Sequence, residues 1–237
     1  MNSNSVIVKG LLLVSLSITS IFANEVNDEV DEASIAKIVI SQNMNKKESL
    51  AVLDRVLSPF EDMTEYALDR DISGMKKGYK NIEKIEDNAL LKQTISSTAL
   101  RILSQNIENL ETYIDNADFS QVALLSSNMF NNSVTNFKYK NNIQDQIHIE
   151  HLDYMGFRLL ALLNAKNTDY TQMSKIITNA KINWNAIKEK VKDENSVDAF
   201  NLLFQGLEES VRTKNSVMIK ILAELDLALV DVIEKKI

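Results

Sequence analysis

The sequence predicts an all-α protein made of antiparallel, up-and-down helical bundles in two related halves. Only five Gly and one Pro occur in 237 residues, which is too few turn residues for a β-rich chain of this length. Apolar residues recur at three- and four-residue spacing along most of the chain, as on one face of a helix. There is no cysteine, so the fold depends on a core that the 45% hydrophobic content can supply.

The first 23 residues predict a cleavable signal peptide. Lys9 precedes an apolar stretch over 10–22, and Ile21 and Ala23 occupy the −3 and −1 positions of a cleavage site. About 13 apolar residues are fewer than the roughly 20 that span a bilayer. The abundance of Asn, Ile and Lys suggests a bacterial source. We therefore expect export to the periplasm, cleavage after Ala23 and a mature chain without a membrane span.

The remaining chain divides into an acidic N-terminal segment with a short helix (24–57), a first helical half (58–140) and a second helical half (141–237). The boundary at 58 rests on Ser58-Pro59-Phe60-Glu61, a capping box with proline at the first helical position. This motif predicts that a helix begins at Ser58. The adjacent Asn141 and Asn142 predict the joint between the two halves.

Helical spacing of apolar residues predicts one long helix over 85–114, followed by a helix capped by Asp118. In the second half, Asp169 and Ser196 are expected to cap helices. The helices predicted there cover 143–163, 170–191, 197–211 and 217–233.

Two passages of the first half match passages of the second half in the same order. Residues 71–75 match 169–173, and residues 99–109 match 199–209. These matches predict an internal duplication. Two copies of about four helices favour tandem bundles over a continuous helical array.

The composition and the motifs favour a binding protein over an enzyme. With 33 acidic and 26 basic residues, the chain repels nucleic acid and anionic membranes. There is no cysteine nucleophile, CxxCH haem site, GxSxG motif or glycine-rich phosphate loop. We expect a non-enzymatic periplasmic module that binds a protein or a small ligand. A hydrolase or isomerase would require a cleft that holds two close Asp or Glu side chains.

The alternative function is metal or haem binding through Asp145, His148, His151 and Met155. At 100° per residue these four side chains fall within an arc of about 120° on one helix. Imidazole and thioether groups suit copper, another transition metal or non-covalently bound haem. The competing interpretation is structural, with hydrogen-bonded histidines and a core methionine. Both histidines of the chain lie in the second half, so such a site would belong to one half only.

Two further residues have structural interpretations. Trp184, the only tryptophan, is flanked by apolar residues at helical spacing, which predicts a core position. Gly206 lies inside the repeated passage and predicts a close helix crossing.

Overall fold

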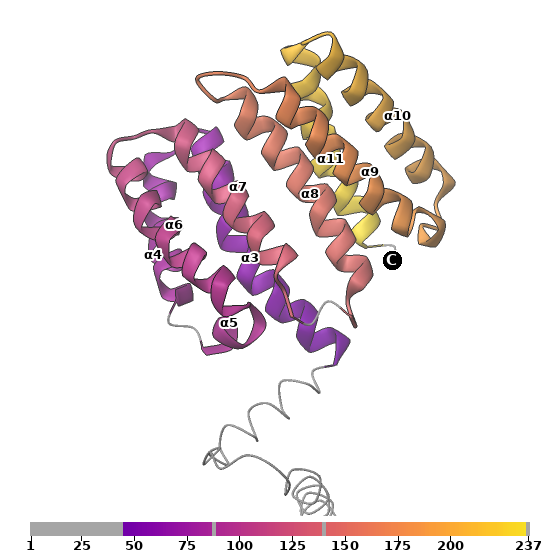
Figure 1. Cartoon of the computed structure of the whole chain (residues 1–237). Coiled ribbons are helices and arrows are strands. Elements are labelled where there is room, and N and C mark those ends of the chain that lie inside the picture. Colours follow the sequence, from indigo (N-terminus) through magenta and orange to yellow (C-terminus); the bar gives the residue numbers. More distant parts are fainter. Residues whose placement is uncertain (1–44, 87–88, 139–140, 236–237) are drawn as a thin grey trace, which may run out of the picture. The chain divides into compact units, whose positions relative to one another are not determined.

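The computed structural model describes residues 45–86, 89–138 and 141–235 (Figure 1). Within these ranges the chain is helical, with a single isolated β-bridge between Ile95 and Phe137. The prediction of an all-α protein is therefore confirmed. The predicted signal peptide, acidic segment and helix over 33–44 lie outside the described residues. None of the described helices is long and apolar enough to cross a membrane.

The first group of helices surrounds one apolar core. Helix α3 packs against α4 and α7, and α6 packs against the same two helices. The group consists of α3 (Lys46–Leu68), α4 (Ile72–Glu86), the short α5 (Ala89–Thr94), α6 (Ser97–Asp115) and α7 (Phe119–Thr135). Its core contains the fully buried Phe60, Met63 and Phe137.

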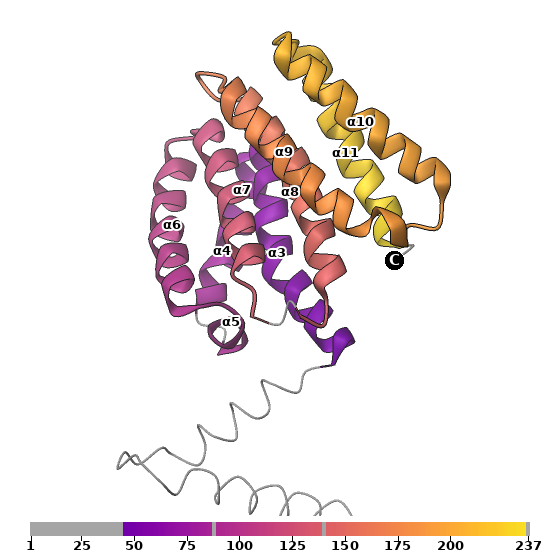
Figure 2. The same ribbon diagram turned by 45° about the vertical axis from the view of Figure 1, so that its right-hand side comes forward.

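The second group has the same ring of helix contacts around a second core. It consists of α8 (Gln144–Leu163), α9 (Tyr170–Ile187), the 3₁₀ turn η1 (Lys188–Lys190), α10 (Glu194–Arg212) and α11 (Ser216–Glu234). Helix α8 packs against α9 and α11, and α10 packs against the same two helices (Figure 2). Helix α8 also packs against α7 and α3, which joins the two groups.

Trp184 is a core residue, as its spacing predicts. It is 2% exposed, and its ring stacks on Phe200 with a centroid distance of 4.5 Å. The indole N–H donates to the Asn201 side-chain oxygen at 3.2 Å, so its polar atom is satisfied. Such burial of a large aromatic ring dominates the packing of a small core.

Three helix ends share one type of turn. After α3, α6 and α10 a residue in the left-handed region is followed by a polar residue that caps the next helix. The left-handed residues are Arg70, Ala117 and Lys214, and the capping residues are Asp71, Asp118 and Asn215. Each capping residue also donates its backbone N–H to the carbonyl five residues earlier, as in a Schellman motif. The predicted caps at Asp118 and Asp169 are confirmed, since they accept from the N–H groups of Gln121 and Gln172.

The predicted helix start at Ser58 is wrong. Helix α3 begins at Lys46, where Asn45 and Glu48 form a capping box, and Pro59 lies inside the helix. The proposed boundary at 58 therefore falls within α3. Proline removes only its own N–H, and the Ser58 hydroxyl bonds back to the Asp54 carbonyl at 2.9 Å. Burial of α3 on both sides of this point keeps the helix continuous, because residues 52–57 and 60–67 both contribute to the core.

The single helix predicted over 85–114 is also wrong. Helix α4 ends at Glu86, and α6 begins after Ser96, whose hydroxyl accepts from the Ala99 N–H at 3.2 Å. Between them the Thr94 carbonyl accepts from the Lys138 N–H at 2.8 Å, next to the bridge at Ile95. This pairing with a distant segment draws the backbone out of the helix.

Two ends in the second half also differ from the prediction. Helix α10 begins at Glu194, and the Ser196 hydroxyl bonds to Asp193 at 2.7 Å instead of capping the helix. Helix α9 ends at Ile187, and the 3₁₀ turn η1 follows it. The other helices match their predicted extents to within a few residues.

Two glycines allow helices to approach α11 closely. A methyl group at Gly156 of α8 would lie 2.6 Å from Leu227 Cδ2 and 2.8 Å from Leu227 Cγ. At Gly206 of α10 it would meet only the end of Leu222, with Cδ1 at 2.9 Å. The crossing predicted at Gly206 is confirmed, and the tighter one is at Gly156.

Gly156→Ala is expected to destabilise the protein by about 1–2 kcal/mol, because overpacking exceeds the gain of up to about 1 kcal/mol in helix propensity. Gly206→Ala is the matched control and should change stability by no more than about 0.5 kcal/mol, since a Leu222 methyl group can rotate away. Urea denaturation measures both. Equal effects of the two substitutions would contradict this account of the α8–α11 crossing.

Candidate functional site

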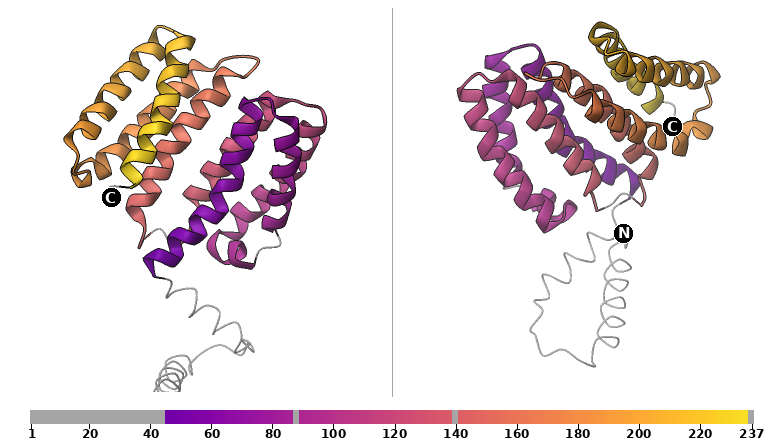
Figure 3. Two further views of the ribbon diagram at one scale, coloured as in Figure 1. Left: turned by 180° about the vertical axis from the view of Figure 1, so that it is seen from behind. Right: turned by 45° about the horizontal axis from the view of Figure 1, so that its top comes forward.

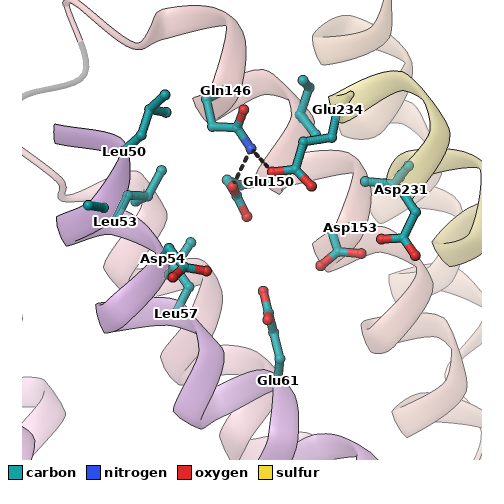
Figure 4. A pocket seen from close by; sticks show the side chains of 13 residues that line it. Leu50, Leu53, Asp54, Leu57, Glu61, Gln146, Glu150, Asp153, Asp231 and Glu234 are labelled. Carbon is teal, nitrogen blue, oxygen red and sulfur yellow. Dashed lines mark hydrogen bonds between the residues drawn. The ribbon is translucent and has the colours of Figure 1, made fainter. Parts of the chain in front are cut away.

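An acidic cavity of about 470 Å³ lies among α3, α8 and α11 (Figures 3 and 4). Carboxylates and apolar side chains share its walls, with a single amide, Gln146. The carboxylates are Asp54, Glu61, Glu150, Asp153, Asp231 and Glu234, and the apolar residues are Leu50, Ala51, Leu53, Leu57, Ile149 and Val230. The described residues that line it therefore include no base.

Three of these carboxylates converge. Glu61, Glu150 and Asp153 each offer an oxygen, and these oxygens lie within 4.8 Å of one another. Glu150 and Asp153 are three residues apart on α8, a spacing that places them on the same face of the helix. Glu61 approaches from α3, and the three side chains are drawn around the same space in Figure 4. We call these three residues the carboxylate triad.

Hydrogen bonds within the described residues satisfy only part of the triad. Gln146 donates to Glu150 at 2.8 Å and to Glu234 at 2.6 Å, which ties α8 to α11 above the cavity (Figure 4). In the described part of the chain, Glu61 and Asp153 have neither a hydrogen bond nor an ion pair from a side chain. Their negative charge is therefore left without a protein counter-ion.

Burial and mutual repulsion raise the pKa values of the whole triad. Desolvation, then the charge of Glu150, raise the pKa of Glu61 to about 8. Desolvation raises the pKa of Glu150 to about 7, although the hydrogen bond from Gln146 opposes this. Desolvation followed by the charge of Glu61 raises the pKa of Asp153 well above its usual range. Near neutral pH the triad consequently holds protons unless another cation replaces them.

Asp226 extends the acidic region into the core. This residue of α11 is fully buried, and its carboxylate packs against Gly156, one turn beyond Asp153 on α8. Burial raises the pKa of Asp226, and its charge contributes to the raised pKa of Asp153.

The residues predicted as the metal or haem site have other partners in this structure. His148 Nδ1 lies 2.8 Å from Asn183 Oδ1, and Asp145 forms an ion pair with Lys190 at 2.5 Å. Met155 is fully buried in the core of the second group. Among the described residues, Asp145, His148 and His151 do not bring three donor atoms within 4.8 Å. The function of this set stays a prediction.

Sequence reasoning missed the triad because its members are far apart along the chain. Glu61 was noticed, but as the last residue of a capping box at Ser58. Since α3 continues through Pro59, the Glu61 side chain is not needed at a helix start and faces the cavity instead. The one local signal was the Glu150-x-x-Asp153 spacing on a helix that also carries apolar residues on its other faces.

Comparison with known proteins finds no family model, no curated protein and no solved structure that matches this chain. The function must be argued from the chemistry of the site.

The raised pKa values predict that stability falls as pH rises. Because the folded pKa values of Glu61 and Glu150 exceed the usual 4.5, the folded state binds more protons than the unfolded chain between about pH 4.5 and 8. The free energy of unfolding, measured with EDTA present, should fall by roughly 2–4 kcal/mol over this range. Glu61→Gln should flatten the profile and stabilise the protein at pH 8.

Glu208→Gln is the control, because Glu208 forms an exposed ion pair with Lys181. Its profile should parallel that of the unmodified protein. An unmodified protein with no loss of stability up to pH 8 would contradict the account, and so would a Glu61→Gln profile as steep as the control.

Proposed function

We propose that this chain is an exported, non-enzymatic binding protein and that the carboxylate triad holds a divalent cation. The observation that carries the proposal is the convergence of three carboxylates within 4.8 Å, with no base among the described residues that line the cavity. Three such groups cannot all ionise in a partly desolvated site unless a cation compensates them. A divalent cation would replace the protons and restore the charged form of all three side chains.

The donor atoms favour a hard cation over copper or haem iron. All three ligands are carboxylate oxygens, which suit Ca²⁺, Mg²⁺ and Mn²⁺. Ca²⁺–oxygen bonds of about 2.3–2.6 Å place opposite ligands about 4.6–5.2 Å apart. The triad oxygens lie within 4.8 Å, so they can bind one ion without large movement.

The cavity leaves room for the remaining ligands. Its volume of about 470 Å³ exceeds that of an ion, and a water molecule occupies about 30 Å³. Water, or oxygen atoms of a ligand bound with the ion, can therefore complete the coordination shell. Asp54, Asp231 and Glu234 line the same cavity and make its approach electrostatically favourable for cations.

Acid–base catalysis is the second candidate, because the cavity is a cleft with close Glu and Asp side chains. Such catalysis requires one carboxyl group that stays protonated beside another that stays ionised. Here the pKa values of all three triad members are raised. Gln146 is the only uncharged polar side chain lining the cavity, so it offers few groups to stabilise a developing charge. Binding explains the arrangement better than catalysis.

We propose the predicted duplication as the origin of the two helix groups. It is supported by the same ring of contacts in each, with α3, α4, α6 and α7 corresponding to α8, α9, α10 and α11. The triad combines residues from α3 and α8, which are equivalent helices in this scheme. The site then arose where the two copies meet.

Calcium, manganese and magnesium binding is tested by isothermal titration calorimetry on protein stripped with EDTA, at pH 7.5. One ion per chain is expected, and a Glu150→Gln, Asp153→Asn double variant should weaken its affinity by at least about tenfold. Asp62→Asn is the control, because this exposed carboxylate is adjacent to Glu61 in α3 but does not line the cavity.

A second double variant, His148→Ala with His151→Ala, separates the two metal hypotheses. It should leave divalent-ion binding unchanged. If the protein binds copper or haem and loses that ligand only in the histidine variant, the alternative function is correct. If no ion binds to the unmodified protein at millimolar concentration, the proposed function fails.

A further inference from the structure

Helix α11 exposes a row of apolar side chains on the face that points away from its own core. The row consists of Met218, Ile221, Leu225, Ala228 and Val232. Its four large side chains are 39–51% exposed. The alternating spacing of three and four residues repeats over two heptads, as on a helix that packs against another helix.

This row is distinct from the face that holds α11 in the fold. The opposite side of α11 buries Ile219, Ala223, Val230 and Ile233 against the rest of the second group. A surface helix normally needs only one apolar stripe, with polar residues on its other side. A second continuous stripe on α11 therefore indicates an interaction surface.

The charges beside the row are acidic on the side of the cavity. Glu224 and Asp231 are seven residues, or about two turns, apart and so lie on the same side of α11. Asp231 lines the acidic cavity, and Glu224 has only a long intrahelical ion pair with Lys220, at 3.7 Å. On the other side of the row, Leu222 and Leu229 are partly buried.

These charges argue against a second copy of this chain as the occupant. A symmetric dimer through the row would place two α11 helices antiparallel across a twofold axis. The same flanks would then face each other and bring Glu224 and Asp231 of both copies together. Like charges at the flanking positions of a helix pair disfavour that pairing. A partner helix with basic flanks fits the surface instead.

We propose that the outward face of α11 binds an amphipathic helix of a partner protein, with apolar residues on the row and Lys or Arg against Glu224 and Asp231. This surface goes beyond the proposed cation site and does not depend on it. The row runs for about 21 Å from Met218 to Val232, which matches a partner helix of four turns.

The test uses a labelled 18-residue peptide with leucine at the alternating three- and four-residue spacing, lysine at the flanking positions and alanine elsewhere. A matched peptide carries glutamate in place of each lysine. In fluorescence anisotropy the lysine peptide is expected to bind at least tenfold more tightly. Leu225→Asp should abolish this binding, and Glu224→Gln with Asp231→Asn should remove the preference for lysine.

Leu202→Asp is the matched control, because Leu202 is 66% exposed on α10 and lies outside the row. It should leave peptide binding unchanged. Circular dichroism of each variant checks that the fold is retained, and Leu225→Ala replaces Leu225→Asp if the latter unfolds. Divalent-ion binding should be unaffected by Leu225→Asp, which separates this proposal from the cation site.

Three results would overturn the proposal. The peptides might bind equally well, or binding might survive substitution of Leu225. Analytical ultracentrifugation might show a dimer that Leu225→Asp dissociates, which would make a second copy the occupant. Binding of the protein to vesicles of phosphatidylcholine and phosphatidylglycerol that requires Leu225, without binding of the lysine peptide, would identify a membrane surface instead.

Discussion

Helix α8 is enclosed by other helices, and this constraint governs most of the structure. It packs against α3 and α7 of the first group and against α9 and α11 of the second. An enclosed helix has little solvent for its polar side chains, and a buried polar group is costly unless it is paired. The sequence of α8 nevertheless includes two acids and an arginine that the packing removes from bulk water.

The structure accommodates these polar residues in two ways. Arg158 is 5% exposed and donates to the Leu124 carbonyl at 2.6 Å and to the Ser127 hydroxyl at 3.1 Å, both on α7. Its burial lowers the pKa of Arg158, and these acceptors partly replace water. Glu150 and Asp153 instead open into the acidic cavity, where Glu61 of α3 adds another negative charge. Burying three uncompensated carboxylates reduces stability, so a cation gives the arrangement a physical reason.

Much of the fold follows from local signals in the sequence. The apolar spacing placed most helices correctly, and Asp118 and Asp169 cap helices because an acceptor three residues before a free N–H is a local feature. Local signals failed where distant contacts decided the outcome. The motif at Ser58 is compatible with a helix start, but packing on both sides of Pro59 keeps α3 continuous. Pairing of Thr94 and Ile95 with residues near 137 interrupts the helix predicted over 85–114.

The candidate site was hidden for the same reason. Residues 61, 150 and 153 belong to two helices whose contact no local pattern specifies, and acidic side chains on amphipathic helices usually face solvent. The two histidines were more conspicuous because they are rare in this chain. In the structure His148 is hydrogen-bonded to Asn183, whereas the abundant carboxylates provide the convergent oxygen atoms.

Diffraction from crystals grown with Mn²⁺ tests the central claim most directly, because the anomalous signal of manganese locates the ion. The account predicts one strong peak in the cavity among α3, α8 and α11, about 2.2 Å from an oxygen of each of Glu61, Glu150 and Asp153. An empty cavity at saturating Mn²⁺, or a peak at His148 and His151 instead, would contradict it.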